Sequence, residues 1–456
     1  MMPNPVIVGA GPAGVRAAQR LVAAGLRPVV IDEAPRAGGQ IYRQPPEGFT
    51  RAKAELYGSE HRKADAIHRA MEALRDKVDF HPESLVWNCE DGVLDVMRDG
   101  VSQGIGYSHL ILATGATDRV LPFPGWLTPG VYTLGGSQVA LKYQGCAIGS
   151  RCVFLGTGPL LYLVAYQYAR AGARVEAVLD TARPGDRLAA LPGMLAAPGL
   201  LARGMGYMAW LRLHGVPVRT GVRPLAVLGG KRVAGLRYRD GRGREQQVEC
   251  DAVGYGLALR AETQLAGLAG CEFEFNARDR NWLPRRDAAG RSSVPGVYVA
   301  GDGAGIAGAD AAELAGERAA LALLADAELP HDPARAQRLE RQLARIGRVR
   351  DALERAFPFP ADWPIADDVM LCRCEEISAG ALRAVARDGL ADELNRAKAL
   401  TRVGMGRCQG RMCAAGAAEV MSQALGVAPQ AVGRLRNQPP VKPIPVHLAI
   451  AREAGQ

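Results

Sequence analysis

The sequence has few aromatic residues, no long apolar run and no leader-like segment. Aromatic residues make up 5% of the 456 residues, so the core must be built mainly from aliphatic side chains and alanine. No run of about 18 apolar residues occurs, which argues against a membrane span. The strand-like segment PVIVG is complete by residue 9, which leaves no room for a signal peptide after Met1. We therefore expect a cytoplasmic protein, or one held at the inner membrane face through partners.

Several chemical signatures are also missing. Cys89, Cys146, Cys152, Cys250 and Cys271 have no second cysteine within five residues, so a dithiol relay is not expected and inert thiols are the better interpretation. None of the 7 histidines stands beside a plausible nucleophile. The formal charge is +9, but its arginines are spread along the chain without a basic block between aromatic residues. We therefore expect no nucleic-acid binding.

Glycine, by contrast, is abundant. There are 55 glycines in 456 residues, well above a background of about 7%. No G-X-Y period accompanies them, so the excess belongs in tight turns and nucleotide-binding loops. At about 100–200 residues per domain, the length predicts two to four domains.

The N-terminal segment carries a dinucleotide-binding fingerprint in its full context. A strand at residues 5–8 precedes Gly9-Ala10-Gly11-Pro12-Ala13-Gly14, which leads into a helical stretch at residues 15–24 and a second strand at 28–31. Gly9 permits the tight turn, Gly11 lets the backbone approach a pyrophosphate, and Gly14 lets the helix pack close to the strand. Glu33 follows the second strand, where a carboxylate can bind ribose hydroxyls.

Three further segments indicate which dinucleotide binds. They are Gly38-Gly39-Gln40, the run LILATG that ends in Thr114 and Gly115, and the run VYVAGD that ends in Gly301 and Asp302. With the fingerprint, these segments resemble the two-dinucleotide-fold flavoprotein family. The resemblance implies bound FAD, with Asp302 on the ribityl chain and a helix from about Ala309 directed at the flavin pyrimidine edge. The expected FAD-binding residues are Gly9, Gly11, Pro12, Ala13, Gly14, Glu33, Gly39, Gln40, Thr114, Gly115, Gly301 and Asp302.

A second fingerprint lies 147 residues further on. A strand at residues 151–155 precedes Gly156 and Gly158, and the same offset carries Glu33 to Asp180. The position that matches Gly14 is Leu161, whose side chain would separate helix from strand or crowd the phosphates. We therefore expect a domain that does not bind NAD(P)H, and that serves as a scaffold or takes another adenine nucleotide at Gly156, Gly158 and Asp180.

The remaining cysteines form a cluster near the C-terminus. Cys372, Cys374, Cys408 and Cys413 follow the pattern C-x-C-x33-C-x4-C. Without a signal peptide, such clustering favours a metal site over disulfides. Four thiolates also suit zinc, but a C-x-C pair is tight for one tetrahedral ion and suits an iron–sulfur cluster better. The pattern therefore favours a 2Fe–2S cluster over zinc.

The surrounding runs CRCE and GMGRCQGRMC resemble the bacterioferritin-associated-ferredoxin-like 2Fe–2S domain, which implies that these four cysteines are the cluster ligands. Together with IDEAPRAGGQIYRQ and GTGPLLYLVA, they resemble the α subunits of heteromeric amine dehydrogenases and oxidases, a group that includes opine oxidase, D-hydroxyproline dehydrogenase, dye-linked proline dehydrogenase and hydrogen cyanide synthase. The resemblance implies that the partner is a substrate-oxidising flavoprotein β subunit, with room for a small third subunit, and that a quinone or respiratory carrier accepts the electrons. Leu161 would then be a shared feature of the group.

These observations predict an α/β fold of the two-dinucleotide-binding-domain type with a small helical C-terminal domain. The expected parts are an FAD-binding domain at residues 1–120 and 250–330, an inserted NAD(P)-type domain at 121–249, a helical linker at 331–365, a 2Fe–2S domain at 366–430 and an extended tail at 431–456. Two rival functions stay open: a self-contained NAD(P)H-dependent flavin and iron–sulfur reductase, and a cluster-carrying assembly or sensor protein with a structural flavin.

Overall fold

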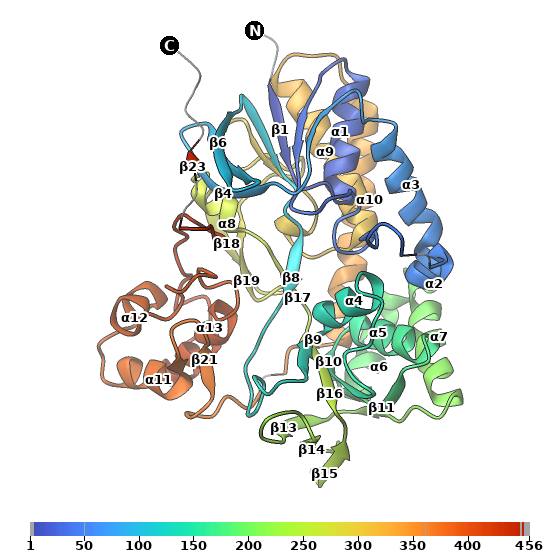
Figure 1. The fold of residues 1–456 in the computed structure, drawn as a ribbon, viewed down its shortest axis with the longest axis vertical. Helices are drawn as coiled ribbons and strands as arrows, with labels where there is room; N and C mark the ends of the chain where they lie inside the picture. The colour runs from blue at the N-terminus through green and yellow to red at the C-terminus, as the bar shows by residue number, and fades with distance from the viewer. Residues whose placement is uncertain (1–3, 50, 361, 447–448, 451–456) are drawn as a thin grey trace.

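The computed structural model describes residues 4–49, 51–360, 362–446 and 449–450. Two five-stranded sheets lie one above the other, each flanked by helices, and a small C-terminal domain lies beside them (Figure 1). Every strand pair within the two sheets is parallel. The predicted α/β architecture with two dinucleotide-binding-type domains is therefore confirmed.

The first sheet has the order β20-β7-β1-β2-β3. Its central strand β1 reads PVIV and is buried at every position, as a parallel strand covered by helices on both faces requires. The strands are β1 (Pro5–Val8), β2 (Val29–Ile31), β3 (Asp79–His81), β7 (His109–Leu112) and β20 (Val297–Val299). The helices are α1 (Pro12–Ala23), α2 (Lys53–Tyr57), α3 (His61–Glu72) and α9 (Ala309–Asp326).

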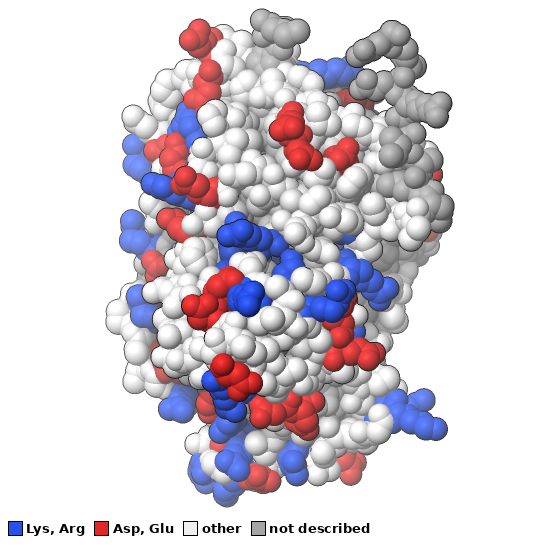
Figure 2. Space-filling view, turned by 90° about the vertical axis from the view of Figure 1, so that its left-hand side faces the viewer, with Lys and Arg blue, Asp and Glu red and all other residues white. Residues whose placement is uncertain are grey.

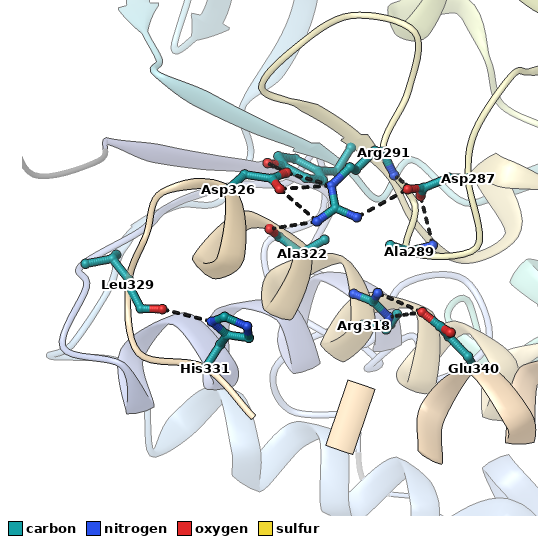
Figure 3. Close-up of polar contacts among 10 residues, drawn as sticks. Asp287, Ala289, Arg291, Arg318, Ala322, Asp326, Leu329, His331 and Glu340 are labelled. Atoms are coloured by element: carbon teal, nitrogen blue, oxygen red, sulfur yellow. Dashed lines mark hydrogen bonds and ion pairs between the residues drawn. The ribbon is translucent and has the colours of Figure 1, made fainter. Parts of the chain in front are cut away.

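Helix α9 is fixed at both of its sides by arginine–carboxylate pairs (Figure 3). Arg291 donates from Nε to both carboxylate oxygens of Asp326, at 3.0 and 2.8 Å, at the end of α9. Arg318 of α9 donates from Nε and Nη2 to Glu340 Oε1, at 2.9 and 2.7 Å. Glu340 belongs to α10 (Pro333–Ala356), the long helix expected in the linker. These pairs hold α9 in the position where it packs along α1.

The second sheet has the order β12-β11-β10-β16-β9. Its strands are β9 (Val131–Thr133), β10 (Arg151–Thr157), β11 (Arg174–Asp180), β12 (Val218–Thr220) and β16 (Ala252–Leu257), and its helices are α4 (Leu134–Lys142), α5 (Pro159–Arg170), α6 (Pro184–Met194) and α7 (Pro198–Leu213). One predicted boundary needs correction. Strand β16 pairs with β10 and β9, so the inserted domain runs past residue 249 to the end of β16. The segment joins this sheet because β10 needs a hydrogen-bonded neighbour on that side.

Smaller ribbons connect and extend the two sheets. One has the order β23-β6-β5-β4, and the others are β13-β14-β15, β17-β8 and β18-β19. Their strands are β4 (Leu85–Glu90), β5 (Val93–Arg98), β6 (Val101–Gly106), β8 (Ala116–Asp118), β13 (Arg223–Leu228), β14 (Gly235–Arg239), β15 (Glu245–Glu249), β17 (Leu259–Ala261), β18 (Phe273–Asn276), β19 (Asn281–Pro284) and β23 (Ala449–Ile450). The short helix α8 (Gln264–Leu268) follows β17. The antiparallel ribbon β8–β17 is the crossing point between the two dinucleotide-type domains.

The C-terminal domain contains β21 (Met370–Cys372), β22 (Ile377–Ser378), α11 (Ala379–Arg387), α12 (Leu394–Thr401) and α13 (Ala414–Leu425). It shares one continuous hydrophobic core with the second sheet. At this junction the rings of Phe123 and Trp363 lie 5.4 Å apart, edge to face, and Trp126 Nε1 donates to Met370 O at 2.8 Å. The C-terminal domain is therefore packed against the flavoprotein-type body and is not a tethered appendage.

Charged side chains of both signs share the face turned toward the viewer in Figure 2. Lys and Arg gather across the middle of this face, with Asp and Glu beside and between them. Among the described residues, no helix combines the length and the apolar character that crossing a membrane requires.

Candidate functional site

The predicted FAD-binding segments converge at the carboxyl edge of the first sheet. A Cβ at Gly9 would lie 2.3 Å from Ala113 O, just before Thr114 and Gly115, and one at Gly301 would lie 2.9 Å from Ala13 Cβ. A Cβ at Gly11 would meet only Gly39, at 3.6 Å. The four segments therefore form one site, and glycine is required where two of them touch.

Helix α1 begins at this site with free amide groups. Gly11 is its N-cap and supplies no side-chain hydrogen bond, and Pro12 is at the first helical position. A Cβ at Gly14 would lie 1.8 Å from Gly9 O, so only glycine lets the helix approach β1 so closely. An uncapped helix N-terminus beside a glycine turn binds the phosphates of a dinucleotide.

Two carboxylates stand at the end of β2. Asp32 accepts hydrogen bonds from the backbone amides of Ala10 and Ala34, the latter at 2.7 Å, and burial raises its pKa. Glu33, the predicted ribose ligand, is 53% exposed at its side chain and forms an ion pair with Lys442 of the C-terminal tail. Lys442 is a site residue that the sequence analysis missed. Its only sequence signal is a single charge within the proline-rich segment 439–445.

The predicted ribityl ligand stabilises its own loop. Asp302 Oδ1 accepts from the amides of Ala307 and Gly308, both at 2.9 Å, directly before α9. Burial raises the pKa of Asp302, although these two backbone bonds oppose the shift. Thr114 Oγ1 donates to Glu262 O at 2.6 Å. Gln40 is exposed and accepts from Arg43 Nη2 at 2.8 Å.

A cavity of about 1800 Å³ separates the two dinucleotide-type domains. Tyr42, Gly308 and Asp310 line it from the first domain, and Thr157 and Gly158 line it from the second. Its size exceeds the roughly 300–1,000 Å³ of ordinary ligand pockets. The cavity has room for an extended cofactor that reaches both domains.

The second fingerprint is built differently from the first. Asp180 is fully buried and accepts from Tyr162 OH at 2.6 Å and from the Ala182 amide at 2.8 Å, and it also pairs with Arg187. Its oxygens therefore stabilise the domain and do not face a ribose. Leu161 is fully buried in the core between α5 and the sheet. Since alanine at Gly14 would already collide with the backbone, this leucine requires a wider helix-to-strand spacing in the second unit.

The four clustered cysteines meet in pairs at one end of the C-terminal domain. A hydrogen bond between Cys413 and Cys372, with the amides of Gly404, Glu375 and Cys374, lowers the pKa of Cys372 to about 5. Burial and the Cys408 thiol beside it raise the pKa of Cys374. Within the described ranges, no three His, Cys, Asp or Glu side chains stand ready to hold a single metal ion. Two thiol pairs with backbone amide donors nevertheless fit a two-iron cluster, which takes two cysteines at each iron.

The cysteine loop packs onto the flavoprotein-type body at strand β17. Leu259 of this strand lines the large cavity, whereas Arg260 lines a smaller recess beside Gln409 and Gly410 of the cysteine loop. Glu262 follows the strand: its amide donates to Gly115 O at 2.9 Å, and its carboxylate pairs with Arg411 Nε at 2.9 Å. One strand thus separates the cavity from the cysteine loop. Glu262 and Arg411 were not predicted, because their roles depend on this long-range contact.

The fold and this site define a class of protein. Residues 3–316 match the model of the pyridine nucleotide-disulphide oxidoreductase family, and residues 370–453 match the sarcosine oxidase A3 domain. The chain belongs to the pyridine nucleotide-disulphide oxidoreductase family, which implies FAD, and the glycine contacts and free α1 amides described above fit that cofactor.

Particular relatives extend over nearly the whole chain. The first of the two, from opine oxidase of Agrobacterium tumefaciens (strain Ach5), is 37% identical, over 96% of this chain and 90% of that protein. Hydrogen cyanide synthase subunit HcnB of Pseudomonas protegens is 35% identical, over 97% of this chain and 96% of that protein. The solved structure of L-proline dehydrogenase from P. horikoshii superimposes with a TM-score of 0.73 at 22% identity, over 99% of this chain and 80% of that chain, and shows the same fold.

Proposed function

We propose that this chain is the FAD- and 2Fe–2S-bearing α subunit of a heteromeric amino-acid or imino-acid dehydrogenase of the opine or D-hydroxyproline type. It would pass electrons between an external acceptor, such as a quinone, and a substrate-oxidising flavoprotein β subunit. The relatives named as subunits of opine oxidase and hydrogen cyanide synthase support this assignment.

The observation that carries the proposal is the position of strand β17. Its residue Leu259 borders the cavity expected to hold the flavin, and the next residue, Arg260, borders the recess beside the cysteine loop. The Glu262–Arg411 pair fixes that loop against the strand. Two redox groups placed on the two sides of one strand would be close enough to exchange electrons.

The two groups supply complementary chemistry when bound, because a flavin carries two electrons and a 2Fe–2S cluster carries one at a time. The residues of this chain hold and insulate them. Gly9, Gly11 and Gly14 admit the pyrophosphate to the α1 amides, Asp302 orders the loop before α9, and the four cysteines with their amide donors hold the cluster.

Cofactor analysis of the purified chain tests the assignment. We expect a flavin absorption band together with iron and acid-labile sulfide. Replacing Cys372 by Ser should abolish the cluster signal in electron paramagnetic resonance while FAD remains bound. The exposed Cys146 provides the matched control, since Cys146→Ser should leave both cofactors in place. A chain that lacks both flavin and iron–sulfide would refute the proposal.

Reduction by pyridine nucleotides separates this function from the self-contained reductase. Because Asp180 is occupied by Tyr162 and Arg187, we expect NADH and NADPH to leave the flavin oxidised. The amino or imino acid should reduce it only in the presence of the β subunit, which is to be sought among the neighbouring reading frames. Rapid bleaching by NADH or NADPH alone would favour the reductase, and a flavin that neither donor can reduce would favour an assembly or sensor protein.

A further inference from the structure

A second, smaller recess of about 80 Å³ lies between the flavoprotein-type body and the C-terminal domain. Its lining includes four arginines, Arg119, Arg260, Arg280 and Arg434, and a single carboxylate, Glu419. The arginines come from separate places: Arg260 lies on β17, Arg119 directly follows β8, Arg280 directly precedes β19, and Arg434 lies beyond α13. The fold therefore gathers positive charge here from four positions that are distant in the sequence.

Only one of the four charges is neutralised within the protein. Arg280 donates from Nη2 to both oxygens of Glu419, at 2.9 and 2.8 Å, and from Nε to the first of them. Among the described residues, neither Arg119, Arg260 nor Arg434 has a carboxylate oxygen within the 4.0 Å of an ion pair. The recess therefore keeps three uncompensated positive charges.

Arg260 is the clearest case. Its Nε is buried and has no hydrogen-bond partner among the described residues. The nearby carboxylate of Glu262 does not serve it, because that carboxylate is paired with Arg411. A buried charged donor without a partner is costly, so a native structure normally satisfies it with a ligand, an ion or water.

The other two arginines are held in place by neutral groups. Arg119 donates to the backbone carbonyl of Asp279 and lies over Phe359 at 5.9 Å from the ring centre. Arg434 lies over the ring of Phe273 at 3.7 Å. Stacked guanidinium groups keep their positions and their charge, and their remaining N–H groups are free for an anion.

We propose that this recess binds a phosphate group. Guanidinium groups bind phosphate and carboxylate oxygens, and three of them around one pocket suit a tetrahedral oxyanion better than a planar carboxylate with two oxygens. A water molecule needs only about 10–15 Å³ of such space, so the recess holds a small polyatomic anion. The bound anion would neutralise Arg119, Arg260 and Arg434 and join the C-terminal domain to the β8–β17 ribbon. This site is separate from both dinucleotide loops and does not rest on the proposed electron-transfer function.

Isothermal titration calorimetry of the purified holoprotein with inorganic phosphate, at constant ionic strength set by chloride, tests the site. We expect saturable binding of one phosphate per chain. Arg260→Gln should weaken the affinity at least tenfold. Arg75→Gln is the matched control, since Arg75 is exposed at the end of α3 and should leave the affinity unchanged. Flavin content and circular dichroism show whether each variant is folded.

Further arms identify the source of the phosphate and protect the test against misfolding. If Arg260→Gln does not fold, Arg434→Gln serves in its place. Equal affinities for inorganic phosphate and AMP would show that only the phosphate group is recognised, whereas tighter AMP binding would identify a nucleotide end as the ligand. The absence of saturable binding, or an affinity that neither substitution lowers, would overturn the proposal. Displacement of phosphate by the β subunit would also overturn it and assign the recess to an acidic side chain of the partner.

Discussion

Arg411 and Glu262 form an ion pair of 2.9 Å between the cysteine loop and the segment that follows strand β17. Both side chains are largely buried, and Arg411 also donates from Nη2 to Gln264 Oε1 at 2.6 Å and to Val441 O at 3.1 Å. The backbone amide of Glu262 in turn bonds to Gly115 O. A continuous chain of polar contacts therefore runs from the predicted flavin loop to the predicted cluster ligands.

Breaking this pair should weaken the attachment of the cysteine loop. We expect Arg411→Gln and Glu262→Gln each to reduce the free energy of unfolding by about 1–3 kcal/mol, because each leaves a buried charged partner unsatisfied. The double variant should cost less than the sum of the two. Urea denaturation in a double-mutant cycle measures this coupling, and strict additivity would show that the pair contributes no interaction energy.

Gly406 should be essential for the cysteine site. A Cβ at this position would lie 2.2 Å from the Cys374 Cβ, so even alanine must displace the first cysteine pair. We expect Gly406→Ala to lower the iron and sulfide content to a small fraction of wild type while FAD content stays constant. Gly347→Ala in α10 is the control, because a Cβ there meets no atom within 4 Å. Full iron content in Gly406→Ala would contradict this account.

Gly14 should be essential for flavin binding. Its Cβ would lie 1.8 Å from Gly9 O, so Gly14→Ala must push α1 away from the phosphate loop. We expect purified Gly14→Ala to lose most of its flavin absorbance and to bind added FAD at least tenfold more weakly in a fluorescence titration. The same Gly347→Ala variant should keep wild-type affinity. Unaltered flavin retention would show that the site tolerates a wider helix-to-strand spacing.

The stability of the chain should depend on the titration of Lys142. Burial lowers the pKa of this lysine to about 8, and it forms no ion pair with the described residues. Because the unfolded lysine titrates near pH 10.4, the unfolded state binds more protons between about pH 8 and 10.4, and stability rises with pH across this window. The gain is on the order of 3 kcal/mol. Below pH 8 the charged lysine destabilises the fold.

Lys142→Met should therefore raise the thermal unfolding midpoint at pH 7 and remove this rise with pH. Differential scanning calorimetry of the variant and wild type from pH 6 to 10 measures the difference. Lys77→Met, at an exposed position, should follow the wild-type profile. A Lys142→Met profile parallel to wild type would indicate that a bound group already neutralises the ammonium.

The sequence predicted well those features that depend on local patterns. Gly9, Gly14 and Gly301 were predicted from spacing alone, and each lies where a side chain would collide with a neighbouring segment. The offset between the two fingerprints placed Asp180 correctly at the end of its strand. It did not show that Tyr162 and Arg187 occupy the carboxylate, because both partners sit on helices whose packing decides which side chain reaches it.

By itself, the sequence determined the two dinucleotide-type units, the order of the parts and the grouping of four cysteines, because loop glycines, buried strands and ligand spacings are short-range requirements of the backbone. Only the tertiary structure decided what faces what. Lys442 reaches Glu33, Arg411 reaches Glu262, and Arg260 is left without a partner among the described residues, through contacts between segments that are far apart in the chain. Such contacts follow from the packing of whole domains, in which burial makes each unmet charge costly.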